Sequence, residues 1–342
     1  MSRTAGTLRR YVLQRLALVV PMVFILLTFV FLLVRVAPGD PVSAALGGRL
    51  PPEALAQRRA AAGYDRPLIV QYLEYLGNVL RGDLGRTISD NRAVSDVLVE
   101  NGGATLTLAG AALVVALLAG IPLGLYSGRH RDSFGDVGVR LFGIVSYAAP
   151  VFFTGLILQL VFAVWLDLFP TSGQASPITQ VRVDEITHIL LLDALLAGNV
   201  DAVLDVVHHL VLPAITLGLL CVGVFLRLVR VNLIQSLQGD YVEAARARGI
   251  PERYVVRRHA FRNALVPVVT VMGLQTALLL SGAILTEATF NWPGLGSELV
   301  DYLNNRDYVA VQGIITVFAV VVVVVSLLID IVNALIDPRV RY

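Results

Sequence analysis

Long apolar stretches that carry no charged residue recur along the chain. A helix needs roughly 20 apolar residues to cross the hydrocarbon core of a bilayer. Stretches that approach this length are therefore expected to be transmembrane helices. They run over residues 16–34, 105–126, 141–166, 210–226, 264–285 and 309–329. The pattern predicts an all-α integral membrane protein with six transmembrane helices.

A seventh apolar stretch, residues 186–207, is interrupted by Asp193, Asp201 and Asp205. An acidic residue at the centre of a span costs about 2.5–3.5 kcal/mol on insertion scales. We therefore expect this stretch to stay outside the hydrocarbon core. Its apolar positions are expected to line one or two short helices that lie at the membrane surface.

Arginines mark the loops expected on the cytoplasmic side, because short cytoplasmic loops carry an excess of basic residues. Arg9, Arg10 and Arg15 precede the first span, and Arg129 and Arg131 lie between the second and third. A denser group follows the fourth span, at positions 227, 230, 246, 248, 253, 257, 258 and 262. Six spans place these loops on one side, with both termini cytoplasmic. The first span lacks a small-residue cleavage site, so we expect it to be retained.

The segment between the first two spans, residues 38–103, falls on the opposite side and is expected to form an extracytoplasmic cap. Short helices are predicted over residues 55–62 and 69–80, separated by the turn-forming Gly63 and Pro67. The chain is accordingly divided into three parts. Residues 1–37 form the N-terminal tail and first span, 38–103 form the cap, and 104–342 form a five-helix transmembrane domain with a cytoplasmic loop at 239–258.

Composition agrees with a membrane protein and excludes other classes. Hydrophobic residues make up 56% of the chain and charged residues 15%, with a mean hydropathy of +0.74. All 27 basic residues of the Lys and Arg class are arginine, so the chain lacks the lysine that a phosphate-binding P-loop requires. The single Cys221 lies in an apolar run and is expected to be a small buried hydrophobe.

The cytoplasmic loop after the fourth span has the sequence marks of a short helix followed by a sharp turn. Asp240 is a suitable N-cap, and Glu243 three residues later completes a capping box. Gly249 can adopt the left-handed conformation that ends a helix, and Pro251 suits the first turn of a second helix. Small alanines on this helix suit docking into a partner's groove, although an ordinary amphipathic linker has the same marks.

Within this loop, Glu243-Ala244-Ala245-x-x-x-Gly249 resembles the EAA motif of binding-protein-dependent ABC importer permeases. In that family the motif forms the coupling helix, which sits in a cleft of the ATPase subunit. The resemblance therefore implies an ATPase-docking set. Its members are Asp240, Glu243, Ala244, Ala245, Arg246 and Gly249. The family's usual Ile-x-Leu-Pro tail is replaced here by residues 259–262, which departs from the general pattern.

Further motifs resemble the dipeptide and oligopeptide branch of the same family, and they cover essentially the whole chain. They are Arg35-Val36-Ala37-Pro38-Gly39-Asp40-Pro41, Gly82-Asp83-Leu84-Gly85, His259-Ala260-x-Arg262-Asn263-Ala264-x-x-Pro267, Trp292-Pro293-Gly294-Leu295-Gly296 and Asp337-Pro338-Arg339. The resemblance implies a type I, MetI-like permease of the cytoplasmic (inner) cell membrane. Its expected cargo is dipeptides or short oligopeptides, with nickel or another small solute as the alternative.

The resemblance also implies the partners and their division of labour. A second homologous permease would complete the translocation path. Two ATPase subunits would bind ATP and magnesium, so no cofactor is expected on this chain. An extracytoplasmic substrate-binding protein would deliver the solute, and membrane lipid would surround the spans. Gln275 and Ser281 are candidates for the translocation path, because the fifth span borders that path in resembling permeases.

Several polar residues near or inside the spans have ordinary structural interpretations. Arg227 and Arg230 are expected to reach the lipid headgroups, with pairing to Asp330 or Asn333 as the alternative. Trp292 is expected to anchor the chain at the membrane interface rather than to receive a binding protein. Polar groups within spans are expected mainly to hold helices together. They are Gln159, Gln275, Thr276 and Ser281.

Two other classes of protein are considered as alternatives. An ion-coupled secondary transporter would need broken helices or buried ionisable groups, and the predicted spans are almost free of charge. An intramembrane enzyme would need a catalytic pair within the spans, and none is evident. His208 and His209 are adjacent and point in different directions on a helix, so they make a poor metal pair. The chain is therefore expected to be non-catalytic, and nucleic acid is not an expected partner.

Overall fold

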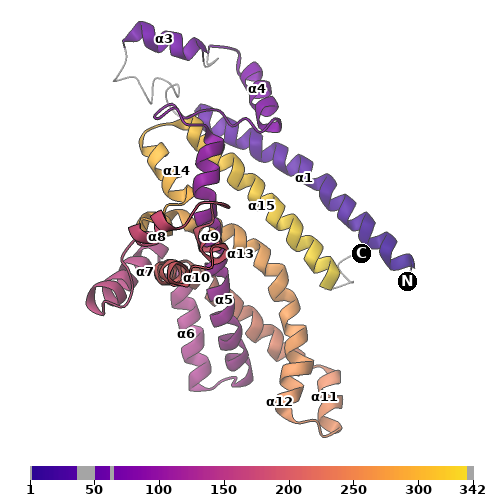
Figure 1. The fold of residues 1–342 in the computed structure, drawn as a ribbon. Coiled ribbons are helices and arrows are strands. Elements are labelled where there is room, and N and C mark those ends of the chain that lie inside the picture. The colour runs from indigo at the N-terminus through magenta and orange to yellow at the C-terminus, as the bar shows by residue number, and fades with distance from the viewer. Residues whose placement is uncertain (1, 37–50, 62–64, 337–342) are drawn as a thin grey trace.

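The computed structural model describes residues 2–36, 51–61 and 65–336, and this part of the chain is almost entirely helical (Figure 1). Across these residues the β-type pairing is a single isolated bridge between Arg86 and Ala93. The all-α prediction is confirmed. Five long helices form the body of the molecule. They are α1 (Ser2–Val36), α5 (Val94–Arg129), α10 (Val200–Leu237), α13 (Phe261–Phe290) and α15 (Tyr308–Ile336).

Shorter elements connect the long helices and include two π-helical segments, η1 and η2. They are α3 (Pro52–Ala61), α4 (Leu68–Leu80), α6 (Phe134–Ala148), α7 (Val151–Leu158), η1 (Gln159–Trp165), α8 (Pro177–Arg182), α9 (Leu190–Leu196), α11 (Asp240–Ala247), α12 (Glu252–Tyr254), η2 (Val255–Ala260) and α14 (Leu295–Asn304). Helices α3 and α4 lie at one end of the molecule, and α11 and α12 lie at the opposite end (Figure 1). The two ends are therefore separated by the length of the helical body.

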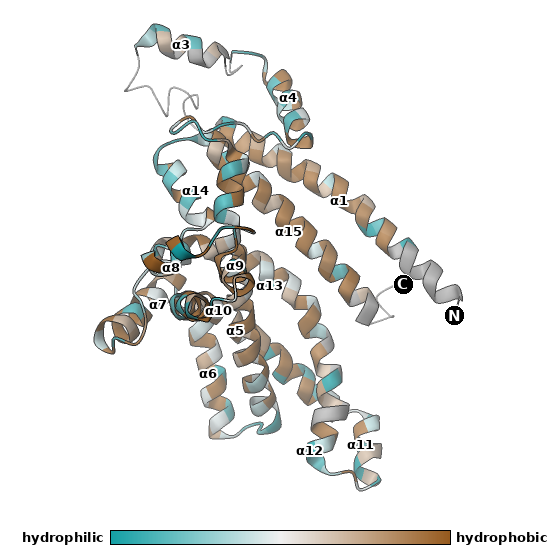
Figure 2. Ribbon diagram, in the orientation of Figure 1, coloured by the Kyte–Doolittle hydropathy of each residue, from teal (hydrophilic) through white to brown (hydrophobic). Residues whose placement is uncertain are grey.

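Helices long and apolar enough to cross a membrane number four in the described part of the chain, or up to six if each of two bent pairs is one span. The four are Val12–Arg35, Val94–Arg129, Val200–Leu237 and Tyr308–Val332. The bent pairs join Phe134–Ala148 to Val151–Trp165 and Pro267–Leu280 to Gly282–Phe290. Hydrophobic residues cover α1 and α15, whereas hydrophilic residues gather on α3 and α14 (Figure 2). A multi-pass membrane protein is confirmed, and the count of six spans stays a prediction.

The span predicted over residues 141–166 is not one straight helix. Helix α6 and the α7–η1 segment meet at an angle of 109°. Ala149 has extended backbone angles, φ −71° and ψ 132°, and Pro150 follows it. A proline disfavours the helical conformation in the residue before it and has no N–H to donate, so the chain turns here. Hydropathy averaged over a window does not register this break.

The prediction that residues 186–207 form a segment separate from the fourth span is only partly correct. Only α9 is a short independent helix, because Gly198 takes a left-handed φ of +64° and ends it. Asn199 then caps α10, and its side chain accepts a hydrogen bond from Ala202 N at 3.1 Å. Residues 200–207 consequently continue without interruption into the fourth predicted span, which makes α10 longer than expected at its N-terminal end.

The two short helices predicted between the first spans are confirmed as α3 and α4. Helix α4 packs on α1 and α15. The hydroxyl of Tyr72 lies 2.5 Å from that of Thr28, and the hydroxyl of Tyr75 lies 2.8 Å from that of Thr316. Phe31 of α1 contacts both tyrosine rings. These contacts hold the middle of the predicted cap against two long apolar helices, while its extracytoplasmic position stays a prediction.

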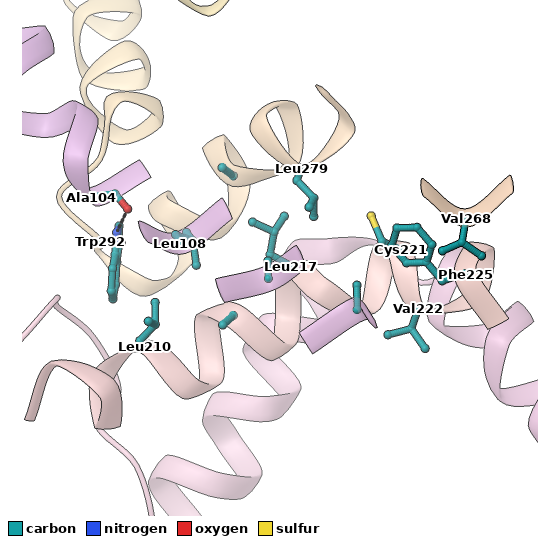
Figure 3. Packing of buried hydrophobic residues seen from close by; sticks show 14 of the residues in the cluster. Ala104, Leu108, Leu210, Leu217, Cys221, Val222, Phe225, Val268, Leu279 and Trp292 are labelled. Atoms are coloured by element: carbon teal, nitrogen blue, oxygen red, sulfur yellow. Dashed lines mark hydrogen bonds between the residues drawn. The ribbon is translucent and has the colours of Figure 1, made fainter. Parts of the chain in front are cut away.

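The main core lies between α5, α10 and α13. Leu108, Leu217 and Leu279, one from each helix, lie together in it (Figure 3). Cys221 is buried in the same cluster, as predicted. Trp292 is also fully buried there, and its Nε1 donates a hydrogen bond to the carbonyl of Ala104 at 3.0 Å. The prediction that Trp292 is an interface anchor is therefore wrong, because the turn after α13 folds its ring inward.

Candidate functional site

The N-cap of α11 lies one residue earlier in the chain than the sequence predicts. Gly239 is the N-cap, and its carbonyl accepts hydrogen bonds from Val242 N at 2.8 Å and from Glu243 N at 3.3 Å. No side chain completes the cap. The predicted capping box on Asp240 is therefore wrong, because Asp240 is already inside the helix. Its carboxylate and that of Glu243 still favour the positive end of the helix dipole.

The end of α11 is a Schellman motif centred on Gly249. Its backbone φ is +73°, the left-handed conformation predicted from the sequence. Gly249 N donates to the carbonyl of Arg246 at 2.9 Å, and Ile250 N donates to that of Ala245 at 3.2 Å. Ile250 then packs on the apolar cluster beneath the helix. Pro251 is the N-cap of α12, one residue before its first turn.

The two faces of α11 have different environments. Val242 and Ala245 are buried in a cluster to which α10, η2 and α13 also contribute. The members of this cluster are Leu233, Val242, Ala245, Val255, Val256, Ala260 and Ala264. Glu243, Ala244 and Arg248 are exposed on the other face. Of the predicted docking residues, Ala245 thus packs inside its own chain, whereas Glu243 and Ala244 are open to a partner.

An ion pair holds α11 against α12. Arg246 donates from Nε and Nη2 to the two carboxylate oxygens of Glu252, at 3.0 and 2.7 Å. This hydrogen bonding lowers the pKa of Glu252 below its ordinary range and raises the pKa of Arg246. Both side chains are about half exposed, so the pair shapes the turn and contributes little to global stability.

Gln275 and Ser281 lie on α13, away from α11. The Gln275 side chain is buried, and its Oε1 accepts a hydrogen bond from the thiol of Cys221 on α10 at 3.3 Å. This contact fits the prediction that polar groups in the spans join helices. The Ser281 side chain lies outside the described residues. A role of either residue on the translocation path stays a prediction.

A buried carboxylate organises the junction between α13 and α14, and the sequence reasoning missed it. Glu287 is fully buried, and its Oε1 accepts a hydrogen bond from the hydroxyl of Thr105 at 2.7 Å. Its Oε2 accepts from Gly296 N at 2.7 Å and from Ser297 N at 3.1 Å. A Cβ at Gly294 would lie 2.3 Å from the carboxylate, which explains one glycine of the Trp292–Gly296 motif.

A second buried carboxylate joins the ends of α5, α6 and α10. Asp136 is fully buried, and both its oxygens accept hydrogen bonds from Arg230, each at 2.9 Å. The prediction that Arg230 reaches the headgroups is therefore wrong, because an acid 94 residues away in sequence receives it. Asp330 pairs instead with Arg15, at 3.2 Å. The Asn333 side chain lies outside the described residues.

Helix α5 approaches α10 along a row of glycines spaced four residues apart. A Cβ at Gly120 would lie 2.8 Å from Phe225 Cβ, and one at Gly124 would lie 2.6 Å from a backbone oxygen of α10. Gly128 continues the row, with Leu233 and Arg230 as its neighbours. Small residues at this spacing allow close packing of membrane helices. The spacing is visible in the sequence and is the signal that could have predicted this contact.

His208 and His209 have separate partners, in keeping with their adjacent positions on α10. The His208 Nε2 atom lies 2.7 Å from the carbonyl oxygen of Leu168, and His209 Nδ1 lies 2.8 Å from that of Asp205. Among the residues that the structure describes, no three His, Cys, Asp or Glu side chains gather as potential metal ligands. The site with the clearest functional features is therefore the exposed face of α11.

Comparison with known proteins decides the family. Residues 120–342 match the family described as "Binding-protein-dependent transport system inner membrane component". Residues 8–109 match the family that describes the N-terminal part of the membrane component of such systems. The chain belongs to this family. The resemblance to ABC importer permeases that the EAA-type motif indicated is thereby confirmed, and the chain is a membrane permease component.

Relatives of this permease match over nearly its whole length. The di/tripeptide permease protein DppB of Pseudomonas aeruginosa is 39% identical, with 97% of this chain and 98% of the relative covered. The dipeptide permease protein DppB of Escherichia coli is 40% identical, with coverage of 97% and 99%. The DppB protein of Alkalihalophilus pseudofirmus is 32% identical, with the same two coverages. The predicted resemblance to the dipeptide and oligopeptide branch is confirmed.

Replacing Glu252 with glutamine is expected to loosen the turn between α11 and α12, because Arg246 loses its charged partner. The expected cost is small, about 0.2–1 kcal/mol. Faster hydrogen–deuterium exchange across residues 239–254 would reveal it. The Asp301→Asn variant, at an exposed position of α14 far along the chain from this turn, is the control and should exchange across residues 239–254 as the wild type does. The lowered pKa of Glu252 means that the contribution is present above its ordinary pKa of 4.5 and is lost as the pH falls through the folded value.

Proposed function

We propose that this permease forms half of the pathway for ATP-driven import of short peptides, and that α11 couples it to a separate ATPase. The single observation that carries the proposal is the exposed face of α11. It presents Glu243 and Ala244 at the end of the molecule opposite α3 and α4 (Figure 1). Near full-length similarity to dipeptide permeases supports the peptide cargo.

The packing of α11 supports a role in transmitting force. A docking helix must be rigid and must be joined to the helices that it moves. The Schellman motif at Gly249 fixes the end of α11. Val242 and Ala245 join a buried cluster that links α11, through η2, with Leu233 of α10 and Ala264 of α13. A displacement of α11 by the ATPase would therefore reach both long helices. Because packed interfaces have discrete arrangements, such a push can switch the pathway between two states.

The remaining partners follow from the same proposal. Two ATPase subunits would hold ATP and magnesium and close on each other, while a second homologous permease completes the pathway. A substrate-binding protein would dock at the end formed by α3, α4 and α14, which is then extracytoplasmic, and both chain termini are cytoplasmic. ATP hydrolysis would lie wholly on the partner chains. Peptide uptake by proteoliposomes that requires ATP would exclude an ion-coupled transporter, and failure of the isolated permease to hydrolyse peptides would exclude an enzyme.

The docking proposal predicts a specific effect at Ala244. An Ala244→Trp variant should insert and fold normally, because the side chain points away from its own chain. We expect at least a tenfold loss of ATPase that co-purifies with the permease, since the bulky ring blocks close approach. The Val181→Trp variant, at an exposed position of α8, is the matched control and should retain the ATPase. Undiminished co-purification with Ala244→Trp would contradict docking through this face.

The cargo is tested separately through the binding protein. We expect the solute that co-purifies with the cognate binding protein to be a dipeptide or short oligopeptide. Mass spectrometry of the released ligand identifies it, and measurement of nickel in the same sample tests the alternative cargo. Nickel in place of peptide would overturn the peptide assignment and leave the docking proposal standing, because the two rest on different parts of the molecule.

A further inference from the structure

A buried ion pair joins the ends of α5, α6 and α10 that lie nearest to α11. The proposed docking of α11 to an ATPase does not by itself explain this pair. Asp136 lies in the first turn of α6, and its carboxylate is the acceptor for Arg230 of α10 through two hydrogen bonds of 2.9 Å. The Ser127 hydroxyl of α5 also donates to it, and Asp132 N donates at 3.1 Å. One buried side chain of α6 thus receives donors from α5, from the turn between α5 and α6, and from the distant helix α10.

The carboxylate of this pair is closed to solvent, and the arginine is mostly buried. The Asp136 side chain has an exposure of 0% and that of Arg230 has 17%. Arg140 approaches the same carboxylate at 3.6 Å but is 45% exposed, so it adds only a peripheral charge. Ion pairs buried to this degree carry a large desolvation cost, so they are often no more stabilising than apolar side chains of the same volume. A role in fixing one geometry is the better physical reason for such a pair.

The Asp136–Arg230 pair lies next to the apolar cluster on which α11 packs. Leu233 follows Arg230 by three residues on α10, so the two lie about one helical turn apart. Leu233 is fully buried and belongs to the same apolar cluster as Val242 and Ala245 of α11. Gly128 of α5 fits against both Leu233 and Arg230, where a Cβ would lie 3.0 Å from the leucine side chain. Helix α10 is therefore fastened to α11 and to the α5–α6 turn at neighbouring positions.

We infer that Asp136 and Arg230 form a positioning pair that makes α6 and the α5–α6 turn move with α10 when the ATPase displaces α11. This inference rests on the proposed coupling role of α11 and adds the element that passes its motion to α6. Without the pair, α11 and α10 still receive the displacement. The α5–α6 turn then slips, so ATP is hydrolysed without a matching movement of the pathway.

The test uses the assembled transporter in proteoliposomes and compares peptides imported per ATP hydrolysed. For Asp136→Asn we expect this ratio to fall at least tenfold while binding-protein-stimulated ATP hydrolysis stays within threefold of wild type. The Arg140→Gln variant removes the exposed arginine near the same carboxylate and should stay within twofold on both measures. A purely structural role predicts instead that import and hydrolysis fall together, in proportion to the assembled complex, and that result would overturn the inference.

A double variant covers the case in which Asp136→Asn leaves an unpaired buried arginine and does not fold. Asp136→Asn with Arg230→Gln removes both charges of the pair and keeps a polar side chain at each position, so it should accumulate as the wild type does. The inference requires it to be as uncoupled as the single variant. Import per ATP restored to within twofold of wild type in the double variant would show that the pair is dispensable and would overturn the inference.

A distance measurement makes the inference independent of the cargo. In a Cys221→Ser background, spin labels at Ala247→Cys on α11 and Gly138→Cys on α6 occupy exposed positions. We expect one narrow distance distribution, unchanged by ATP, and a width at least doubled by Asp136→Asn. Equal widths would overturn the inference. If the wild-type transporter imports no peptide, the proposed function fails, while the distance between the two labels still reports whether α6 and α11 move together.

Discussion

Replacing Glu287 with alanine is expected to produce the largest loss of stability of any single substitution considered for this permease. The substitution removes the acceptor for the hydroxyl of Thr105 and for the backbone N–H groups of Gly296 and Ser297. A buried donor left without a partner costs about 1–3 kcal/mol. Three such donors lie in one site, and the cavity left by the side chain adds to the cost. We expect a total of several kcal/mol.

The expected readout is the yield and melting temperature of the purified permease. Glu298→Ala, on α14 close to this site, is the matched control, and it should change the melting temperature little because that side chain is only partly buried. Glu287→Gln should retain most of the stability. Its carbonyl oxygen can still accept from Gly296 and Ser297, while its amide faces the hydroxyl oxygen of Thr105. A Glu287→Ala variant as stable as the wild type would show that these hydrogen bonds are not needed.

The second large effect is expected at Gly124, where α5 meets α10. A Cβ there would lie 2.6 Å from the carbonyl oxygen of Leu226 and 2.7 Å from Val229 Cβ, so the helices must separate. Overpacking of this kind costs about 1–3 kcal/mol. Gly124→Ala is therefore expected to lower the melting temperature and the folded yield. Because the glycine row continues beside Arg230, import is expected to fall as well.

The same helix supplies a control of opposite sign. Gly110 also lies inside α5, but a Cβ there would meet nothing within 4 Å. Gly110→Ala should stabilise the permease slightly, by about 0.5–1 kcal/mol, because alanine restricts the unfolded chain and favours the helix. The two variants have the same chemical change and the same secondary structure. Equal melting temperatures for both would mean that the approach of α5 to α10 does not limit stability.

Hydropathy predicted the apolar helices well, because burial in lipid depends on the average character of many residues. Local marks also predicted α3, α4 and the left-handed Gly249, since each depends on a few neighbouring residues. The break at Pro150 was missed for the opposite reason, because a window average hides a single residue. The cap of α11 was misplaced by one residue because Gly239 and Asp240 are both acceptable N-caps, and the carbonyl geometry decides between them.

Charged and aromatic residues near span ends were the least predictable part of the site. An arginine such as Arg230 has two possible destinations, the headgroups or a buried acid, and the sequence does not show that Asp136 lies beside it. Trp292 has the same ambiguity, because an interface anchor and a core residue both follow the end of a span. Their partners come from distant segments. The EAA-type motif predicts the docking loop, but only the packing separates the buried residues of that loop from its exposed ones.

Because its buried and exposed residues are separate, α11 is a helix whose exposed residues can be exchanged without disturbing its packing. Both of its ends are closed by backbone hydrogen bonds at Gly239 and Gly249, which do not depend on the side chains between them. Val242 and Ala245 must suit the host permease, since they face its core, and Arg246 must keep its pair with Glu252. On the proposed docking role, the other exposed positions are then free to match a different ATPase. Grafting these exposed residues from another permease should redirect the transporter to that permease's ATPase without redesign of the helices that carry the cargo.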